Sequence, residues 1–471
     1  MKKKAVLIAV MLILALSCAL VLNGCRLNID LVSETPVEKN RLQYTLKNDG
    51  TYAVSGIPCK QDFFGRDIYE YGEKIYTTVR IPAKHEGIAV TEISDYAFNN
   101  WKFLKSIKIP DTITRIGNSA FKGCDQLKSL TLPKSVSEIC EASFGNCPSL
   151  KKVEILNPSI NIDHQAFKES NNIGNFKLKN GGKYLFSNGA LIDSSTKTLV
   201  YLNENHDIPD DGSVEKLGDY LFYGRESLEE IVIPASVSAI GSHAFQACNN
   251  LRSVVFSGDV YELGEWCFER CNKLEQINIE DLKVEEIQPW IFSGCQALNK
   301  VDLPGNIVKI CDFAFSSTGI QEISFPESVS EIGEYAFGSC DQLKKVQLNN
   351  GISRIEEGAF AYCKKLTMIS IPDNITYFGK DVFADASVSY YVDNNIKYLG
   401  NRGNNYLILV GAINTGLTEY EINSSTKIIC DQAFSGCTEL KEILIPKSVV
   451  YIGPEAFDKN VKIIRETEEP T

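Results

Sequence analysis

Histidine and catalytic signatures are scarce in this chain. Four histidines occur among 471 residues, at His85, His164, His206 and His243, and their positions predict surface side chains. The sequence has no Gly-x-Ser-x-Gly turn, no Walker-type phosphate loop, no dinucleotide fingerprint and no His-Glu-x-x-His pair. We therefore expect no catalytic residue, no metal site and no cofactor. An enzyme with its site in an insertion is the remaining alternative.

Positive charge is also in short supply. The chain has 48 lysines and arginines against 60 aspartates and glutamates, which gives a formal net charge of −12. Proteins that bind nucleic acid need basic stripes to neutralise phosphates. The acidic balance therefore argues against a nucleic acid partner.

Long apolar runs are limited to the start of the chain, from Ala5 to Leu22. This run follows three lysines and precedes small residues, which predicts a secretory signal over residues 1–24. The segment Leu22-Asn23-Gly24-Cys25 resembles a bacterial lipobox, so Cys25 is expected to be acylated and to become the mature N-terminus. A plain signal peptide or an uncleaved anchor is the alternative. Residues 25–40 are polar and predict a tether.

These features predict an exported lipoprotein that is held on the cell surface by its acyl chains alone. No other stretch of the sequence is long and apolar enough to span a membrane. Acylation contributes about 0.8 kcal/mol of membrane affinity per buried methylene, so several chains on one cysteine would anchor the protein firmly.

A repeat occupies most of the remaining sequence. Its mark is an aromatic residue, usually after alanine, that recurs every 22 to 24 residues except for two steps of 55 and 51. A period in this range is typical of a solenoid whose coils bury their apolar faces by stacking. The marking residues are Phe98, Phe121, Phe144, Phe167, Phe222, Phe245, Phe268, Phe292, Phe315, Phe337, Phe360, Phe383, Phe434 and Phe457.

One copy, from Phe121 to Phe144, indicates how a coil is built. Leu130 and Leu132 enclose a polar Thr131 and precede a proline, which predicts a short strand. The segment from Ile116 to Leu127 has apolar residues three and four positions apart, which favours a helical or 3₁₀ turn. We therefore predict an α/β repeat solenoid, with a parallel sheet on one face and short turns on the other.

The cysteines follow the same period. Of fifteen, eight stand three residues after the marking phenylalanine: Cys124, Cys147, Cys248, Cys271, Cys295, Cys340, Cys363 and Cys437. Four others, Cys140, Cys267, Cys311 and Cys430, replace a glycine or an alanine of the repeat. Free cysteine behaves as a small buried apolar residue, so we predict thiols inside the solenoid. Disulfides between adjacent coils are the alternative.

The repeat resembles the BspA-type bacterial leucine-rich repeat, a class of about 23 residues found in cell-surface proteins. The resemblance covers roughly Val90 to Ile464 and implies a right-handed coil of the leucine-rich-repeat type over residues 90–465. It also implies an adhesin-like role, because BspA-like proteins are associated with binding extracellular-matrix components. The usual asparagine position of such repeats is mostly occupied here by small polar residues such as Ser135 and Ser236.

The ends of the repeat region and its two long steps suggest additional elements. Asn48-Asp49-Gly50 lies between two strand-like runs and predicts a hairpin, within an N-terminal capping region over residues 41–89. The long steps contain similar extra residues, at about 175–210 and 388–420, which favour β-hairpin insertions. The sharper interpretation is that these insertions contact a ligand. Residues 466–471 form an acidic tail.

The predicted strands offer a candidate binding face. In each coil the residue between the last two inward apolar residues should point outward, on the concave side. These positions hold Lys108, Thr131, Glu154, Val232, Val255, Asn278, Asp302, Ser324, Gln347 and Ser370. The residues at these positions fit a sheet surface that only contacts solvent. They also fit a surface that recognises a protein or glycan ligand. A third interpretation is a scaffold whose partner is another protein of the bacterial envelope, with no host role.

Overall fold

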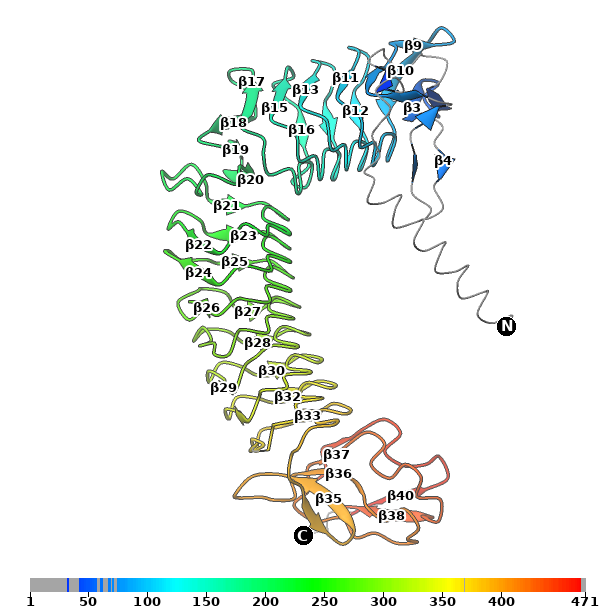
Figure 1. The fold of residues 1–471 in the computed structure, drawn as a ribbon. Coiled ribbons are helices and arrows are strands. Elements are labelled where there is room, and N and C mark those ends of the chain that lie inside the picture. Colours follow the sequence, from blue (N-terminus) through cyan, green and yellow to red (C-terminus); the bar gives the residue numbers. More distant parts are fainter. Residues whose placement is uncertain are drawn as a thin grey trace, which may run out of the picture. The chain divides into compact units, whose positions relative to one another are not determined.

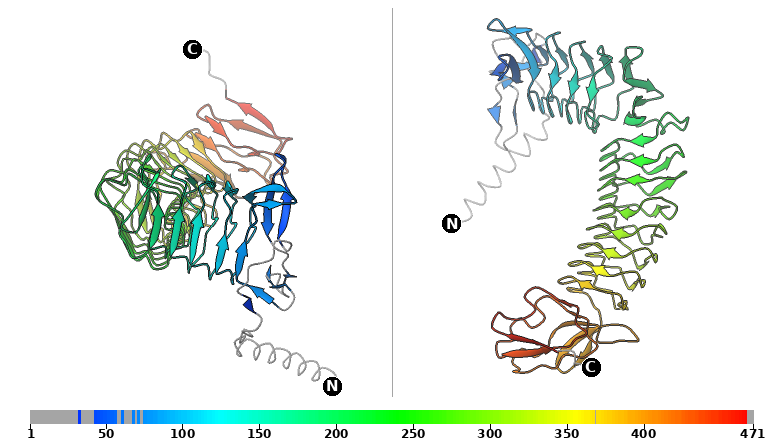
Figure 2. Two further views of the ribbon diagram at one scale, coloured as in Figure 1. Left: turned by 90° about the horizontal axis from the view of Figure 1, so that it is seen from above. Right: turned by 180° about the vertical axis from the view of Figure 1, so that it is seen from behind.

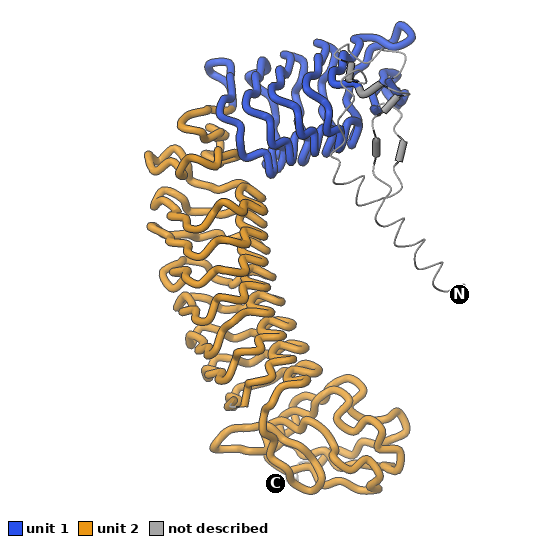
Figure 3. The backbone as a smooth tube through the Cα atoms, viewed as in Figure 1, with its two compact units in different colours: residues 1–183 blue, residues 184–471 orange. Residues whose placement is uncertain are grey.

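The computed structural model describes residues 32–33, 42–56, 60–61, 67–68, 70–71, 74–367 and 369–466. It divides into two compact units, residues 1–183 and residues 184–471 (Figure 3). Each unit is a stack of coils joined by parallel strands. Cys25, the signal segment, most of the tether and most of the acidic tail lie outside the described residues, although Val32–Ser33 of the tether form a short strand.

The first parallel ladder contains most of the strands that the Leu-x-Leu pattern predicts, but no strand is assigned around Asp302 or Ser370. Neighbouring strands pair in register one coil apart, as Leu130 does with Val153 and Val232 with Val255 (Figure 1). In residues 1–183 it includes β8 (Thr78–Arg80), β11 (Ser106–Lys108), β13 (Ser129–Leu132), β15 (Lys152–Ile155) and β17 (Asn175–Leu178). In residues 184–471 it includes β22 (Glu230–Ile233), β24 (Ser253–Phe256), β26 (Gln276–Ile277), β29 (Glu322–Ser324), β31 (Lys345–Gln347), β38 (Glu442–Ile445) and β40 (Lys462–Arg465).

A second parallel ladder lies further along each coil, and the sequence pattern did not predict it. Its strands are mostly two residues long, so they show no period-2 alternation that could have been recognised. In the first unit it contains β10 (Ile88–Ile93), β12 (Arg115–Ile116), β14 (Glu138–Ile139) and β16 (Asn161–Ile162). In the second it contains β21 (Lys216–Leu217), β23 (Ala239–Ile240), β25 (Glu262–Leu263), β27 (Glu286–Ile287), β28 (Lys309–Ile310), β30 (Glu331–Ile332), β32 (Arg354–Ile355), β33 (Tyr377–Phe378), β37 (Ile428–Ile429) and β39 (Tyr451–Ile452).

The turns on the other side of each coil are not helical. The described part of the chain contains no α-helix and no 3₁₀ helix, so the predicted helical turns are not found. Tyr96, Phe98 and Asn100 donate backbone hydrogen bonds to carbonyls of the next coil, at 2.9, 2.7 and 2.7 Å, while Ala97 and Asn99 donate to carbonyls within their own coil. Apolar residues three and four positions apart fit these turns as well as a helix, so their spacing does not distinguish the two structures.

Left-handed backbone explains why a helix cannot form there. Tyr96 and Asn100 both have φ of +58°, a value that a right-handed helix does not allow. The same two positions are left-handed in most copies of the repeat, two residues before and two residues after the phenylalanine. Alternate N–H groups are thereby turned toward the neighbouring coil. The turns stack as a third column, which is visible along the coils in the right panel of Figure 2.

The core is a column of stacked phenylalanines. Phe98, Phe121, Phe144 and Phe167 stack in the first unit, with ring centroids 5.2 to 5.8 Å apart. A second column runs from Phe222 to Phe383 in the second unit, and a third pair joins Phe434 to Phe457 at 5.0 Å. Leucine, isoleucine and valine of both ladders complete the buried interior around these rings.

The N-terminal region contains the hairpin that Asn48-Asp49-Gly50 predicts. β2 (Gln43–Leu46) and β3 (Tyr52–Gly56) are antiparallel, and β3 also pairs in parallel with β10. The hairpin therefore covers the open edge of the second ladder. The other short strands of this region are β1 (Val32–Ser33), β4 (Lys60–Gln61), β5 (Asp67–Ile68), β6 (Glu70–Tyr71), β7 (Lys74–Tyr76) and β9 (Lys84–His85).

Both long steps of the repeat contain three antiparallel strands. In the first step these are β18 (Tyr184–Ser187), β19 (Ala190–Asp193) and β20 (Thr198–Leu202). In the second they are β34 (Tyr391–Asp393), β35 (Ile396–Leu399) and β36 (Ile408–Ala412). The last strand of each group pairs in parallel with a coil strand, β20 with β21 and β36 with β37.

Candidate functional site

The predicted binding face, which we call the outward strand face, follows the first ladder, but Asn278, Asp302 and Ser370 lie outside its assigned strands. Eight of the ten predicted positions are exposed, and Glu154 and Asn278 are partly buried. The exposed eight are Lys108, Thr131, Val232, Val255, Asp302, Ser324, Gln347 and Ser370. Exposure alone does not tell which side of the array is concave, so that part of the expectation stays a prediction.

Several polar residues of the outward strand face are engaged by contacts between coils. Lys177 donates to a Glu154 carboxylate oxygen at 2.5 Å, and this bond lowers the pKa of Glu154. The Asn278 amide bonds both the N–H and the carbonyl of Phe256, at 2.8 and 3.1 Å. These side chains join neighbouring strands and offer fewer free groups to a ligand.

Two valines of this face differ, because they are apolar and exposed. Val232 of β22 and Val255 of β24 are direct partners in the ladder, and they are 60% and 43% exposed. They form a small apolar patch on an otherwise polar strand face.

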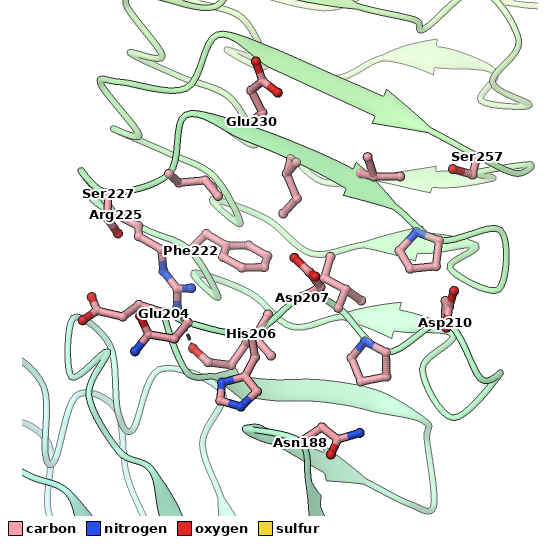
Figure 4. A pocket seen from close by; sticks show the side chains of 18 of the residues that line it. Asn188, Glu204, His206, Asp207, Asp210, Phe222, Arg225, Ser227, Glu230 and Ser257 are labelled. Carbon is pink, nitrogen blue, oxygen red and sulfur yellow. Dashed lines mark hydrogen bonds between the residues drawn. The ribbon is translucent and has the colours of Figure 1, made fainter.

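A cavity of about 1130 Å³ lies beside Val232, where the first inserted strands meet β22. Its floor includes Phe222, Ile231 and Val232, and its wall is the loop after β20, residues 203–210 (Figure 4). The sequence pattern indicated two parts of this lining, the insertion at about 175–210 and Val232, but not that they meet in one cavity. It also gave no role to Arg225, which stands at the repeat position that most coils fill with cysteine.

Arg225 is a buried cation at the back of this cavity. Its side chain is 4% exposed, one guanidinium nitrogen donates to the Leu202 carbonyl at 2.7 Å, and the guanidinium lies 4.8 Å from the centre of the Phe222 ring. Burial lowers the pKa of Arg225, and the negative charge of Glu204 opposes that shift. Arg225 therefore links the inserted segment to the coil that follows it.

Carboxylates surround the cavity. Asp207 lies near the middle of the view in Figure 4, with Glu204 and Asp210 on either side and Glu230 on β22. All four side chains are exposed. A ligand at this position would meet negative charge above an apolar floor.

The second long step forms a comparable cavity of about 930 Å³ over the strand face. It is lined by Gln347 and Ser370 of the predicted binding face and by Tyr390 and Tyr391 of the inserted segment. Its charged lining residues are Lys345, Asp373 and Arg402, so it does not share the acidic character of the first cavity.

The turn column carries a row of aromatic rings that the sequence reading did not identify. Six half-exposed rings stack face to face in successive coils, with centroids 4.0 to 5.8 Å apart. They belong to Tyr220, His243, Trp266, Trp290, Phe313 and Tyr335, all at left-handed positions two residues before the phenylalanine. Because each ring covers the next, only their edges face solvent.

The twelve repeat cysteines lie in the interior, as the period predicted. Eleven are buried and Cys140 is half-buried, and within the described residues all twelve are free thiols. Burial raises the pKa of Cys147 and of Cys248 to about 12, which keeps these thiols protonated and poorly nucleophilic. Their positions indicate packing residues.

The described residues hold no cluster of three or more histidine, cysteine or acidic side chains with a geometry suited to a metal ion. The same residues contain no helix that could cross a membrane. Cys25, the predicted lipidation site, falls outside this part of the chain.

Comparison with known proteins identifies the repeat. The family model of the BspA type leucine rich repeat region matches residues 91–212, 215–340, 292–403 and 413–468. No curated protein sequence matches the chain.

Solved structures with the same kind of repeat include two bacterial proteins. A leucine-rich repeat protein from Bacteroides ovatus is 20% identical, with 92% of this chain and 100% of that chain covered and a TM-score of 0.39. A leucine rich cell surface protein from Faecalibacterium prausnitzii is also 20% identical, with coverage of 93% and 96% and a TM-score of 0.35. Because the family model spans well over half of its residues, the chain belongs to the BspA-type leucine-rich repeat family.

Proposed function

We propose that this chain is a non-enzymatic binding protein, displayed on the bacterial surface, that recognises a protein ligand through the outward strand face. Membership of the BspA-type family supports a binding role, and the leader sequence supports export. The adhesin-like function and the extracellular-matrix ligand come from the family resemblance.

The observation that carries the proposal is the exposed pair Val232 and Val255. A solvated sheet surface has no need of adjacent apolar side chains, whereas the centre of a protein interface is enriched in apolar contacts. Fully burying an exposed valine contributes about 1.5 kcal/mol or more. Because Val232 and Val255 are 60% and 43% exposed, covering both contributes about that much in total, which corresponds to roughly tenfold in affinity.

The test is capture by the full-length chain from two sources, a panel of extracellular-matrix proteins and the solubilised envelope of the producing cell. The double variant Val232→Ser/Val255→Ser should weaken capture about tenfold or more. The matched control, Val308→Ser/Val450→Ser, removes two exposed valines that precede strands of the second ladder. Equal losses in both variants, or capture from neither source, would contradict the proposal.

The proposed anchor is an acylated Cys25. Labelled palmitate should enter the wild-type protein in growing cells and should not enter a Cys25→Ala variant. Incorporation that is undiminished in the variant, or absent from the wild type, would refute lipidation at this residue.

A further inference from the structure

β22 has a free edge. Within the described residues it pairs with β24 on one side and with no strand on the other. The carbonyls of Glu229 and Ile233 accept N–H groups of the β24 coil at 2.7 and 3.0 Å, so the odd-numbered residues of β22 face β24. Since backbone groups alternate along a strand, the N–H and C=O groups of Glu230 and Val232 point to the opposite edge.

This free edge opens into the cavity. Glu230 and Val232 both line it, and the opposite wall is the loop of residues 203–210. Figure 1 shows that loop on the side of β22 away from β24. β24 and β26 have no such opening on this side, because each is paired there with the strand of the preceding coil. The inserted strands therefore leave a cavity beside an unpaired strand.

The side chains that line the cavity indicate which kind of chain segment could bind there. Its lining includes five carboxylates, at Glu204, Asp207, Asp210, Glu229 and Glu230, against the single guanidinium of Arg225. Asp207, Asp210, Glu229 and Glu230 form no salt bridge with any residue that the structure describes. An uncompensated negative rim above an apolar floor favours a partner with basic and apolar side chains.

We propose that the free edge of β22 binds an extended peptide segment of a partner protein, with basic side chains alternating with apolar ones. The segment adds a strand to β22: its backbone bonds to Glu230 and Val232, its apolar residues lie on the face of Ile231, and its cations lie on the opposite face, beside Glu230. The inference rests on the proposed function in taking the ligand to be a protein.

The experiment measures fluorescence anisotropy of a labelled nine-residue peptide of alternating lysine and valine with the full-length chain. We expect saturable binding. The same peptide with alternate backbone amides N-methylated should bind at least tenfold more weakly, because methylation removes the donors that pair with a strand edge. A glutamate–valine peptide should also bind at least tenfold more weakly.

Protein variants locate the site. Asp207→Lys/Glu230→Lys should weaken binding of the lysine–valine peptide at least tenfold, and circular dichroism should show that the fold is retained. Glu419→Lys/Glu421→Lys makes the same change of charge at two exposed carboxylates that line neither cavity, and should change binding less than twofold. Equal effects of the two double variants would show that long-range electrostatics, and not this site, controls peptide binding. That result would overturn the proposal.

Three further results would overturn it: no binding of the lysine–valine peptide, equal binding of the N-methylated peptide, or equal binding of the glutamate peptide. The two proposals fail separately. If the valine pair proves irrelevant to protein capture while peptide binding behaves as described, the outward strand face is refuted and the edge of β22 stands.

Discussion

The thiol of Cys271 donates a hydrogen bond to the backbone carbonyl of Phe245, one coil earlier, at 3.2 Å. Cys124, Cys147 and Cys248 repeat this bond to the phenylalanine of the coil before them, at 3.4, 3.2 and 3.0 Å. Ser170 occupies the same repeat position, and its hydroxyl makes the equivalent bond to Phe144 at 2.6 Å. The position therefore selects a small donor that links two coils.

This bond predicts unequal effects of two substitutions at Cys271. Cys271→Ala removes the donor and leaves a small void, and should lower the free energy of unfolding by about 1–2 kcal/mol. Cys271→Ser keeps a donor of similar size and should cost less than about 1 kcal/mol. Urea unfolding of both variants gives the comparison. A serine variant as damaged as the alanine variant would show that the thiol serves only to fill space.

Buried thiols also predict loss of stability at high pH. Burial raises the pKa of Cys147 and Cys248 to about 12, above the ordinary value of 9.0. In the unfolded chain these thiols ionise near 9, so unfolding releases protons between pH 9 and 12, and stability falls as pH rises through that window. Each thiol contributes a slope of about 1.4 kcal/mol per pH unit.

The measurement is the free energy of unfolding at pH 8, 9, 10 and 11. Cys248→Ser removes one ionising group, so its curve should fall less steeply than that of the wild type. Parallel curves would mean that this thiol does not contribute to the alkaline loss.

The phenylalanine column predicts that position in the stack sets the cost of removing a ring. Phe245 is fully buried and stacks on Phe222 at 4.8 Å and Phe268 at 5.1 Å, whereas Phe457 is half-buried and, among the described residues, stacks on Phe434 alone. Phe245→Ala should therefore cost about 3–5 kcal/mol, and Phe457→Ala less than about half of that. Thermal unfolding compares them. Equal losses of stability in the two variants would show that stacking on both sides of a ring does not raise the cost of removing it.

Left-handed backbone predicts a stabilising glycine. Ala247 has φ of +59° at the position two residues after Phe245. Four other copies of the repeat place glycine there, also with positive φ: Gly123, Gly224, Gly294 and Gly436. Ala247→Gly should raise the free energy of unfolding by about 0.5–1 kcal/mol, because glycine adopts this conformation without strain.

The control for this substitution is Ala297→Gly, at a residue of the same unit that does not have positive φ. It should lower stability by about 0.5–1 kcal/mol, since glycine loses more conformational freedom on folding. Chemical denaturation reports both changes. A loss of stability at both positions would show that backbone strain at Ala247 is too small to matter.

The sequence by itself determined the repeat, its register and most of its interior. The reason is geometric: stacked coils bring equivalent positions to the same depth, so the residue types at Phe121 and Cys124 of one copy recur wherever that depth recurs. The same regularity placed Thr131 and Val255 on an outward face. It also separated the twelve interior cysteines from Cys25 at the predicted lipidation site.

Only the tertiary structure decided the rest. The two-residue strands of the second ladder and the left-handed turns depend on hydrogen bonds between coils, which no local pattern encodes. The free edge of β22 and its acidic cavity arise where a long step interrupts the stack and gives this strand a neighbour on one side alone. A repeat specifies what recurs, whereas a site built at an interruption depends on how residues from the inserted loop and from β22 meet in space.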